Sequence, residues 1–282
     1  MESTARGRVV LVTGGSAGIG RSTVTRLARD GAHVVTCARG GERLEQAVGA
    51  LPGVSTVVAD VADAADRERL LDRVLDEHGR LDAVVLNAGL GWAGLVEDMP
   101  GDAVERLIGL NLTGVVELTR IALPHLLDAA AQRGRADVVT VASAAAWSQV
   151  PPLTVYSATK AGVHGFVKGL RREVTARGVR VHTVNPGPVS TEWLARGHGS
   201  PPVSDADARG RLSPGVRPDR VADQVAGCLT SPWSRTVAVP RWMGLARLGE
   251  VPPVDRVLDL VLSRQADRIR RVTARTVERR TG

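Results

Sequence analysis

Two side chains with complementary chemistry stand four residues apart in this chain. Tyr156 is the only tyrosine, and Lys160, one of two lysines, follows it in the run YSATK. On a helix, positions i and i+4 share a face, so the ammonium group would lie beside the phenol. A phenol has a pKa of about 10, and a nearby positive charge lowers that pKa toward neutrality. The pair predicts a proton-exchanging tyrosine, and an aromatic that only packs beside a surface lysine is the alternative.

A glycine-rich turn near the N-terminus gives a second chemical signal. The apolar run RVVLVT (8–13) ends in GGSAGIG, and a helical pattern follows it. Glycines let a backbone turn tightly and approach a pyrophosphate, which then binds the amide groups at the positive end of the helix. A tight turn packed on a sheet would need similar residues. The pattern favours a dinucleotide site built on Thr13, Gly14, Gly18 and Gly20.

The elements that position these residues alternate between apolar strands and helices. The strands are Val-rich without interruption, which predicts a Rossmann-like α/β fold, a doubly wound parallel sheet covered by helices on both faces. We expect strands at 8–13, 33–38, 54–60, 81–89, 136–143, 179–187 and 235–240. We expect a first helix that follows the glycine-rich turn and ends at residue 30. Further helices are expected near 41–50, 64–78, 102–131, 156–177 and 218–230.

Residues 1–240 are expected to form this single domain, and 241–282 an extension that is largely helical. Within the domain, 190–217 is rich in Gly, Pro, Ser and charge and is too long for an ordinary connection. We expect this segment to cover the substrate, and a solvated loop without a role is the alternative.

The chain is similar to short-chain dehydrogenases/reductases from about residue 7 to residue 240. The resemblance rests on motifs in the family's order and at its spacing. One departure is Leu86, where the family often has an asparagine, and we expect it to affect packing more than chemistry. The motifs are TGGSAGIG (13–20), DV (60–61), NAG (87–89), Asn111 in GLNLTG, Ser143 thirteen residues before the tyrosine, YSATK (156–160) and PGPVST (186–191).

The resemblance implies a role for each of four catalytic residues. Tyr156 would protonate a carbonyl oxygen during reduction and deprotonate the alcohol during oxidation. Lys160 would lower the pKa of the tyrosine and bind the nicotinamide ribose. Ser143 would hydrogen-bond the substrate oxygen and polarise it. Asn111 would hold a water molecule that links Lys160 to solvent.

Cofactor choice is predicted from the end of the second strand. An acidic residue there would bind an unmodified adenosine ribose, but the chain has Ala38 followed by Arg39. A guanidinium suits a 2′-phosphate, so NADP(H) is favoured over NAD(H). The expected cofactor-binding residues are Gly14, Ser16, Gly18, Ile19, Gly20, Arg39, Asp60, Val61, Asn87, Ala88, Gly89, Tyr156, Lys160, Pro186, Gly187, Val189 and Thr191.

The sequence thus favours an NADP(H)-dependent carbonyl reductase or alcohol dehydrogenase. A catalytically silent NADP(H) sensor or scaffold is one alternative, and an epimerase or dehydratase that uses the same tyrosine is another. We expect the substrate, a ketone or secondary alcohol, to be apolar. That expectation rests on Leu90, Trp92, Ala93, Val150, Leu153, Trp193 and Leu194 near the pocket mouth.

Composition restricts the partners and the cellular location. The net charge is +7, but basic and acidic residues are interleaved and aromatic residues make up only 2%, so we expect no nucleic-acid partner. Cys37 and Cys228 are expected to be reduced and buried, and no metal site is expected. The N-terminus lacks an apolar signal region and no run of 18 apolar residues occurs, so a soluble, cytoplasmic protein is expected.

A helix from 254 to about 278 is expected in the extension, with a basic face opposite an apolar stripe. We expect the stripe to pack on another subunit, in a homodimer or homotetramer, or on the chain's own domain. A solvated helix and a peripheral membrane contact are alternatives, and the membrane contact is the least favoured. The stripe consists of Val254, Val257, Leu258, Val261, Leu262 and Ile269.

Overall fold

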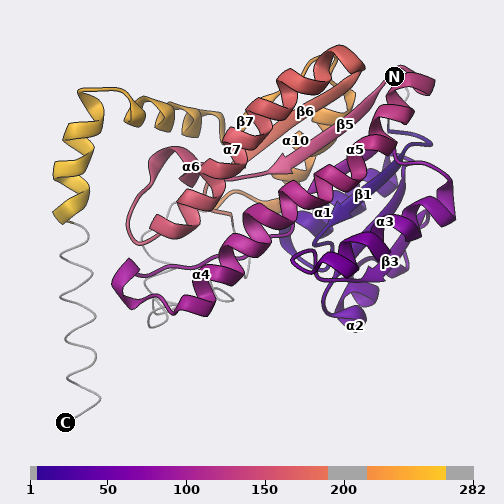
Figure 1. The fold of residues 1–282 in the computed structure, drawn as a ribbon, viewed down its shortest axis with the longest axis horizontal. Coiled ribbons are helices and arrows are strands. Elements are labelled where there is room, and N and C mark those ends of the chain that lie inside the picture. The colour runs from indigo at the N-terminus through magenta and orange to yellow at the C-terminus, as the bar shows by residue number, and fades with distance from the viewer. Residues whose placement is uncertain (1–4, 190–214, 265–282) are drawn as a thin grey trace, which may run out of the picture.

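A seven-stranded parallel sheet forms the centre of the molecule. The computed structural model describes residues 5–189 and 215–264 (Figure 1). The strand order is β3-β2-β1-β4-β5-β6-β7, so the chain winds outward from β1 in both directions, as the sequence predicts. The strands are β1 (Val9–Thr13), β2 (His33–Ala38), β3 (Val54–Val58), β4 (Ala83–Leu86), β5 (Ala136–Val141), β6 (Val179–Pro186) and β7 (Thr236–Val239).

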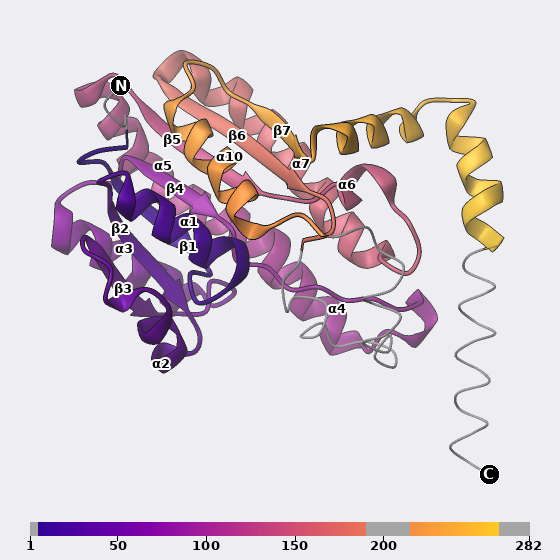
Figure 2. The same cartoon turned by 180° about the vertical axis from the view of Figure 1, so that it is seen from behind.

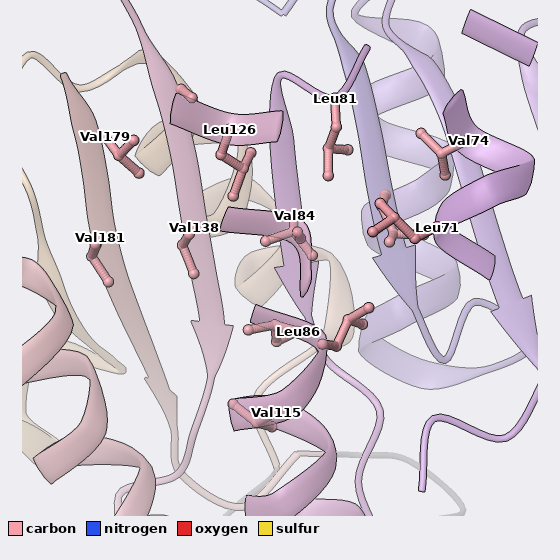
Figure 3. Packing of buried hydrophobic residues seen from close by; sticks show 14 of the residues in the cluster. Leu71, Val74, Leu81, Val84, Leu86, Val115, Leu126, Val138, Val179 and Val181 are labelled. Carbon is pink, nitrogen blue, oxygen red and sulfur yellow. The ribbon is translucent and has the colours of Figure 1, made fainter. Parts of the chain in front are cut away.

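Helices cover both faces of the sheet because the strands are apolar on both sides. One layer contains α3 (Ala64–His78), α5 (Gly114–Arg133) and α7 (Thr154–Val174), and Figure 3 shows its packing on β4, β5 and β6. The other layer contains α1 (Gly18–Arg29), α2 (Gly41–Leu44) and α10 (Pro218–Thr230), and α1 and α10 lie in front in Figure 2. Leu86 is buried in the core between the sheet and the layer of α3, α5 and α7, so its role is packing.

Two of the expected helices contain a π-helical turn. The helix expected near 41–50 is α2 followed by the π-turn Glu45–Gly49. The helix expected near 102–131 is α4 (Gly101–Ile108), the π-turn η3 (Gly109–Thr113) and α5. This continuous run is long and apolar enough to cross a membrane by composition alone, but its buried face packs on the sheet. The η3 turn contains Asn111, and π-turns of this kind occur often at functional sites.

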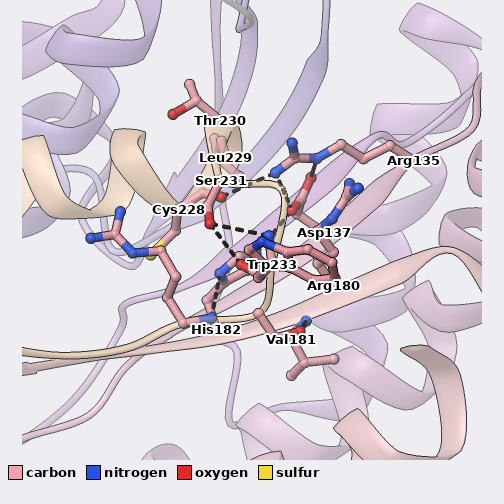
Figure 4. Close-up of polar contacts among 12 residues, drawn as sticks. Arg135, Asp137, Arg180, Val181, His182, Cys228, Leu229, Thr230, Ser231 and Trp233 are labelled. Atoms are coloured by element: carbon pink, nitrogen blue, oxygen red, sulfur yellow. Dashed lines mark hydrogen bonds and ion pairs between the residues drawn. The ribbon is translucent and has the colours of Figure 1, made fainter.

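A buried ionic cluster lies at the edge of the sheet where β5 and β6 begin (Figure 4). The carboxylate of Asp137 accepts hydrogen bonds from Arg8 at 2.7 Å, from Arg135 at 2.8 Å and from Nε2 of His182 at 3.0 Å. Nδ1 of His182 accepts the backbone N–H of Arg235, so the proton of the neutral ring is on Nε2. Burial alone would raise the pKa of Asp137, but these donors outweigh burial and lower it to about 2.

Beyond β7 the chain leaves the sheet as a 3₁₀-helix, η5 (Arg241–Glu250), and an α-helix over 254–264, drawn in yellow and standing apart in Figures 1 and 2. Val254, Val257 and Val261 are exposed, so the expected packing of the stripe on the chain's own domain is wrong for these residues. Leu258 and Leu262 are half-buried, and Leu258 lies against Gly249 of η5. Away from the exposed valines, 254–264 carries Asp255, Arg256 and Asp259, and most of the residues of the expected basic face follow residue 264. Ile269 and the expected helix beyond 264 lie outside the described residues.

Candidate active site

The glycine-rich turn joins β1 to α1 at the carboxyl edge of the sheet. Gly14 and Gly18 have φ values of +77° and +53°, which favour glycine. A Cβ at Gly20 would overlap the carbonyl oxygen of Gly14, so Gly20 allows the helix to approach the turn closely. At the N-cap of α1, Ala17 provides no side-chain hydrogen bond to the first-turn amides. The backbone N–H groups of Gly14 and Gly15 donate to the carbonyl of Cys37, but the first-turn amides of α1 keep their capacity to bind a phosphate group, which fits a nicotinamide dinucleotide.

Thr13 has a role that the sequence analysis did not identify. Its hydroxyl oxygen accepts the backbone N–H groups of Asn87 at 3.0 Å and Ala88 at 2.9 Å. The Asn87 side chain donates back to the carbonyl oxygen of Thr13 at 2.9 Å. These bonds join the ends of β1 and β4 and fix the glycine-rich turn. The side-chain amide of Asn87, expected to line the adenosine, is therefore partly engaged in holding this turn.

Ser143 and Tyr156 meet beside the end of β5. Ser143 follows the strand, and its hydroxyl accepts the backbone N–H of Ala145 at 3.1 Å. Tyr156 lies in the first turn of α7 and is buried with Trp92 and Leu153. Burial raises the pKa of Tyr156 to about 12, and a hydrogen bond with Ser143 acts in the opposite direction.

Lys160 lies one turn after Tyr156 and is also buried. Its Nζ is 5.8 Å from the centroid of the Tyr156 ring and donates to the carbonyl oxygen of Val141 at 3.4 Å. Burial lowers the pKa of Lys160 to about 8. The two residues share a helix face, as expected, but the pKa of Tyr156 is not lowered toward neutrality in this geometry. The cost of burying a phenolate among apolar side chains outweighs the hydrogen bond with Ser143, which alone would lower the pKa.

Asn111 faces the same site from the π-turn η3. Its Oδ1 accepts the backbone N–H of Leu90 at 2.8 Å, and its Nδ2 donates to the Leu90 carbonyl at 2.9 Å and to Thr159 at 3.2 Å. A Cβ at Gly89 would be 3.3 Å from Oδ1 of Asn111 and 3.5 Å from Nζ of Lys160. Asn111 and Lys160 therefore both border the space that Gly89 leaves, and a water molecule that links Lys160 to solvent stays a prediction.

The residues expected at the adenosine end lie after β2 and β3. Arg39 directly follows β2, and its side chain is 73% exposed, with Nη1 3.9 Å from Oδ2 of Asp60. Oδ1 of Asp60 accepts the backbone N–H of Ala62 at 3.0 Å. Val61 is buried in the core beside this segment. One exposed guanidinium thus stands at the position where a 2′-phosphate is expected.

The segment expected to bind the nicotinamide extends from the end of β6. Asn185 is buried, and its Oδ1 contacts Nε2 of His164 at 2.5 Å, an interaction that the sequence analysis missed. The N–H of Gly187 donates to the carbonyl of Val239 at 2.8 Å. Val189 forms an isolated bridge with Val216. Thr191, Trp193, Leu194 and most of the expected cover at 190–217 lie outside the described residues.

The sequence profile of the family described as short chain dehydrogenase matches residues 8–198, which contain these features. The chain belongs to the short-chain dehydrogenase/reductase family. Membership assigns a general dehydrogenase or reductase activity with a nicotinamide cofactor, as the resemblance implied.

Similar proteins cover most of this short-chain dehydrogenase/reductase. Dehydrogenase/reductase SDR family member 4 of Bos taurus is 34% identical over 191 residues, which are 66% of this chain and 67% of the relative. The 3-ketoacyl-(acyl-carrier-protein) reductase from Brucella melitensis complexed with NADH has a TM-score of 0.73 at 30% identity, covering 84% and 99% of the two chains. The alcohol dehydrogenase from Thermococcus sibiricus complexed with 5-hydroxy-NADP has a TM-score of 0.70 at 28% identity, covering 82% and 95%.

Five of the residues expected near the mouth of the substrate pocket lie in the described part of this short-chain dehydrogenase/reductase. Leu90, Trp92 and Leu153 pack together around Tyr156, and Trp92 is buried. Ala93 and Val150 are half-buried. Across 5–189 and 215–264, no three His, Cys, Asp or Glu side chains group so as to hold a metal ion.

Proposed function

We propose that this protein is an NADP(H)-dependent carbonyl reductase or alcohol dehydrogenase that acts on an apolar ketone or secondary alcohol. The observation that carries the proposal is the meeting of Ser143, Tyr156 and Lys160 at the carboxyl edge of the sheet, close to the glycine-rich turn. Ligands of doubly wound sheets bind at this edge. The apolar surroundings of Tyr156 support a substrate of the same character.

Tyr156, Ser143 and Lys160 would each have a different role in carbonyl reduction. When bound, NADPH supplies the hydride that reduces the carbonyl carbon. A phenol with a pKa of about 12 is protonated at neutral pH, so Tyr156 is in the form that donates a proton to the carbonyl oxygen. Ser143 hydrogen-bonds the same oxygen and stabilises the charge that develops on it. Lys160, with a pKa of about 8, keeps most of its charge at neutral pH and stabilises the phenolate after proton transfer.

The cofactor would be held by residues that follow the carboxyl ends of the strands. The turn Gly14–Gly20 and the first-turn amides of α1 would bind the pyrophosphate. Arg39 would bind the 2′-phosphate, since Ala38 places no acidic group at the end of β2. The related alcohol dehydrogenase complex with 5-hydroxy-NADP agrees with this choice, whereas the related reductase complex contains NADH.

The test is the change in nicotinamide absorbance when ketones and alcohols are screened with both cofactors. Stoichiometric consumption of NADPH with a ketone supports the proposal. Binding of NADPH without turnover across the panel would favour a sensor or scaffold. Conversion of a substrate without net consumption of the cofactor would favour an epimerase or dehydratase.

A further inference from the structure

The 3₁₀-helix η5 presents three faces with different chemistry, because residues three apart share a face in such a helix. One face, Met243, Ala246 and Gly249, is half-buried against the domain. Met243 contacts Gly187, where an added Cβ would be 3.3 Å from its side chain. A second face, Arg241, Gly244 and Arg247, borders the edge strand β7. The third face, Trp242, Leu245 and Leu248, is exposed.

The arginine face of η5 borders a hollow of about 360 Å³ beside the edge strand β7. Arg235, Arg241 and Arg247 all line this hollow. Arg235 donates to the carbonyl of Gly227 at 3.1 Å, and Arg247 stacks 4.4 Å from the ring of Trp147. Among the described side chains, of which that of Glu250 is not one, none of the three forms an ion pair with a carboxylate. Three guanidinium groups that line one hollow, without an ion pair to any described carboxylate, favour a phosphate group as the ligand.

The third face of η5 is apolar and open to solvent. Trp242 and Leu245 are each 65% exposed and Leu248 is 57% exposed. The apolar exposure continues along the chain through Val251, Val257 and Leu260. This many large apolar side chains exposed within one short segment indicate an interaction site.

We infer that η5 and the helix at 254–264 form a docking surface for an anionic phospholipid membrane. The hollow takes lipid phosphate groups, and Trp242, Leu245 and Leu248 enter the interface. Tryptophan and leucine on one face, with arginine on the next, are typical of segments that lie in a membrane surface. Because η5 packs on α6 (Ala145–Ser148), which follows Ser143, docking brings the membrane close to the candidate active site.

A second copy of the chain fits this surface less well. A two-fold contact places the same patch of both subunits together, so unpaired arginines of one copy would face those of the other. The acidic residues Asp255 and Asp259 lie on the face of the 254–264 helix opposite its exposed valines. A membrane rich in anionic lipid neutralises the arginines directly and leaves Asp255 and Asp259 in water.

The experiment is sedimentation of the full-length protein with phosphatidylcholine vesicles that contain, or lack, about one third phosphatidylglycerol. The wild type is expected to sediment only with the anionic vesicles, and less at high salt. The double variant Arg241→Gln/Arg247→Gln is expected to bind about 30-fold more weakly, since each basic residue at such a surface contributes roughly fivefold. The matched control Arg172→Gln/Arg177→Gln removes the same charge from two exposed positions, one in the last turn of α7 and one in the 3₁₀ turn after it, and should bind within about threefold of wild type.

The remaining outcomes each overturn the inference. Equal loss in both double variants would show a net-charge effect without a site. No sedimentation, with a particle mass that falls in Trp242→Ser/Leu245→Ser, would assign the surface to a second copy. Stabilisation by inorganic phosphate that needs Arg241 and Arg247, without vesicle binding, would assign the hollow to a free phosphate. Circular dichroism and melting of each variant show that a lost signal is not unfolding.

Discussion

Arg39→Ala tests the cofactor preference with little disturbance of the free protein. The side chain is 73% exposed, and its only ion pair in the described residues is 3.9 Å long, to Asp60. Exposed pairs contribute about 0–1 kcal/mol, so their loss should barely change the free energy of unfolding. A charge-assisted hydrogen bond to a 2′-phosphate contributes about 1.5–3 kcal/mol, and the exposure of Arg39 places it at the lower end. The dissociation constant for NADPH should therefore rise about tenfold, since about 1.4 kcal/mol corresponds to a factor of ten.

Calorimetric titration of wild type and variant with NADPH and NADH measures this difference. NADH lacks the 2′-phosphate, so its affinity should change less than about threefold. Arg39→Lys keeps the charge but loses the planar fork, and it should lie between wild type and Arg39→Ala. An equal loss for both cofactors, or a wild type that binds NADH more tightly than NADPH, would refute the reasoning and leave Arg39 as ordinary surface charge.

Three further predictions concern the turn, the lysine and the ionic cluster. Gly20→Ala should abolish nucleotide binding, because its Cβ overlaps the Gly14 carbonyl; unchanged binding in a fluorescence titration would contradict the geometry. Ketone reduction should decline as pH rises through about 8, where Lys160 loses its proton, and a rate that stays flat to pH 10 would exclude a role for its charge. The lowered pKa of Asp137 should stabilise the fold by about 2 kcal/mol, fully present above pH ~4 and lost as pH falls toward about 2. The difference in free energy of unfolding between wild type and Asp137→Asn should shrink over this window, and a constant difference would show that the ionised carboxylate is not the cause.

The fold could be predicted from the sequence where local signals agree with tertiary packing. Helix α3 has the predicted bounds 64–78, because Asp63 caps its N-terminus by accepting the N–H of Asp66 and Gly79 ends it with a φ of +68°. The π-turn η3 and the 3₁₀-helix η5 could not be predicted. Their hydrogen-bond register depends on contacts with distant residues, such as Asn111 with Leu90 and Met243 with Gly187.

The site could be predicted as a set of residues but not as an electrostatic environment. The spacing of Tyr156 and Lys160 correctly places them on one helix face. The direction in which the pKa of Tyr156 is shifted depends on the apolar residues that surround the phenol. One of them is Trp92, which is more than sixty positions away in the sequence. The hydrogen bonds of Thr13 to Asn87 and Ala88 were missed for a similar reason, since strand order brings them together.

The most direct test of the proposed mechanism is turnover of a ketone with NADPH by Tyr156→Phe. Phenylalanine keeps the ring that packs with Trp92 and Leu153 and removes only the hydroxyl that meets Ser143. The turnover number should decrease at least ~10²-fold, while the affinity for NADPH stays within about threefold of wild type. A variant that reduces the ketone at a rate within a few-fold of wild type would contradict Tyr156 as the proton donor.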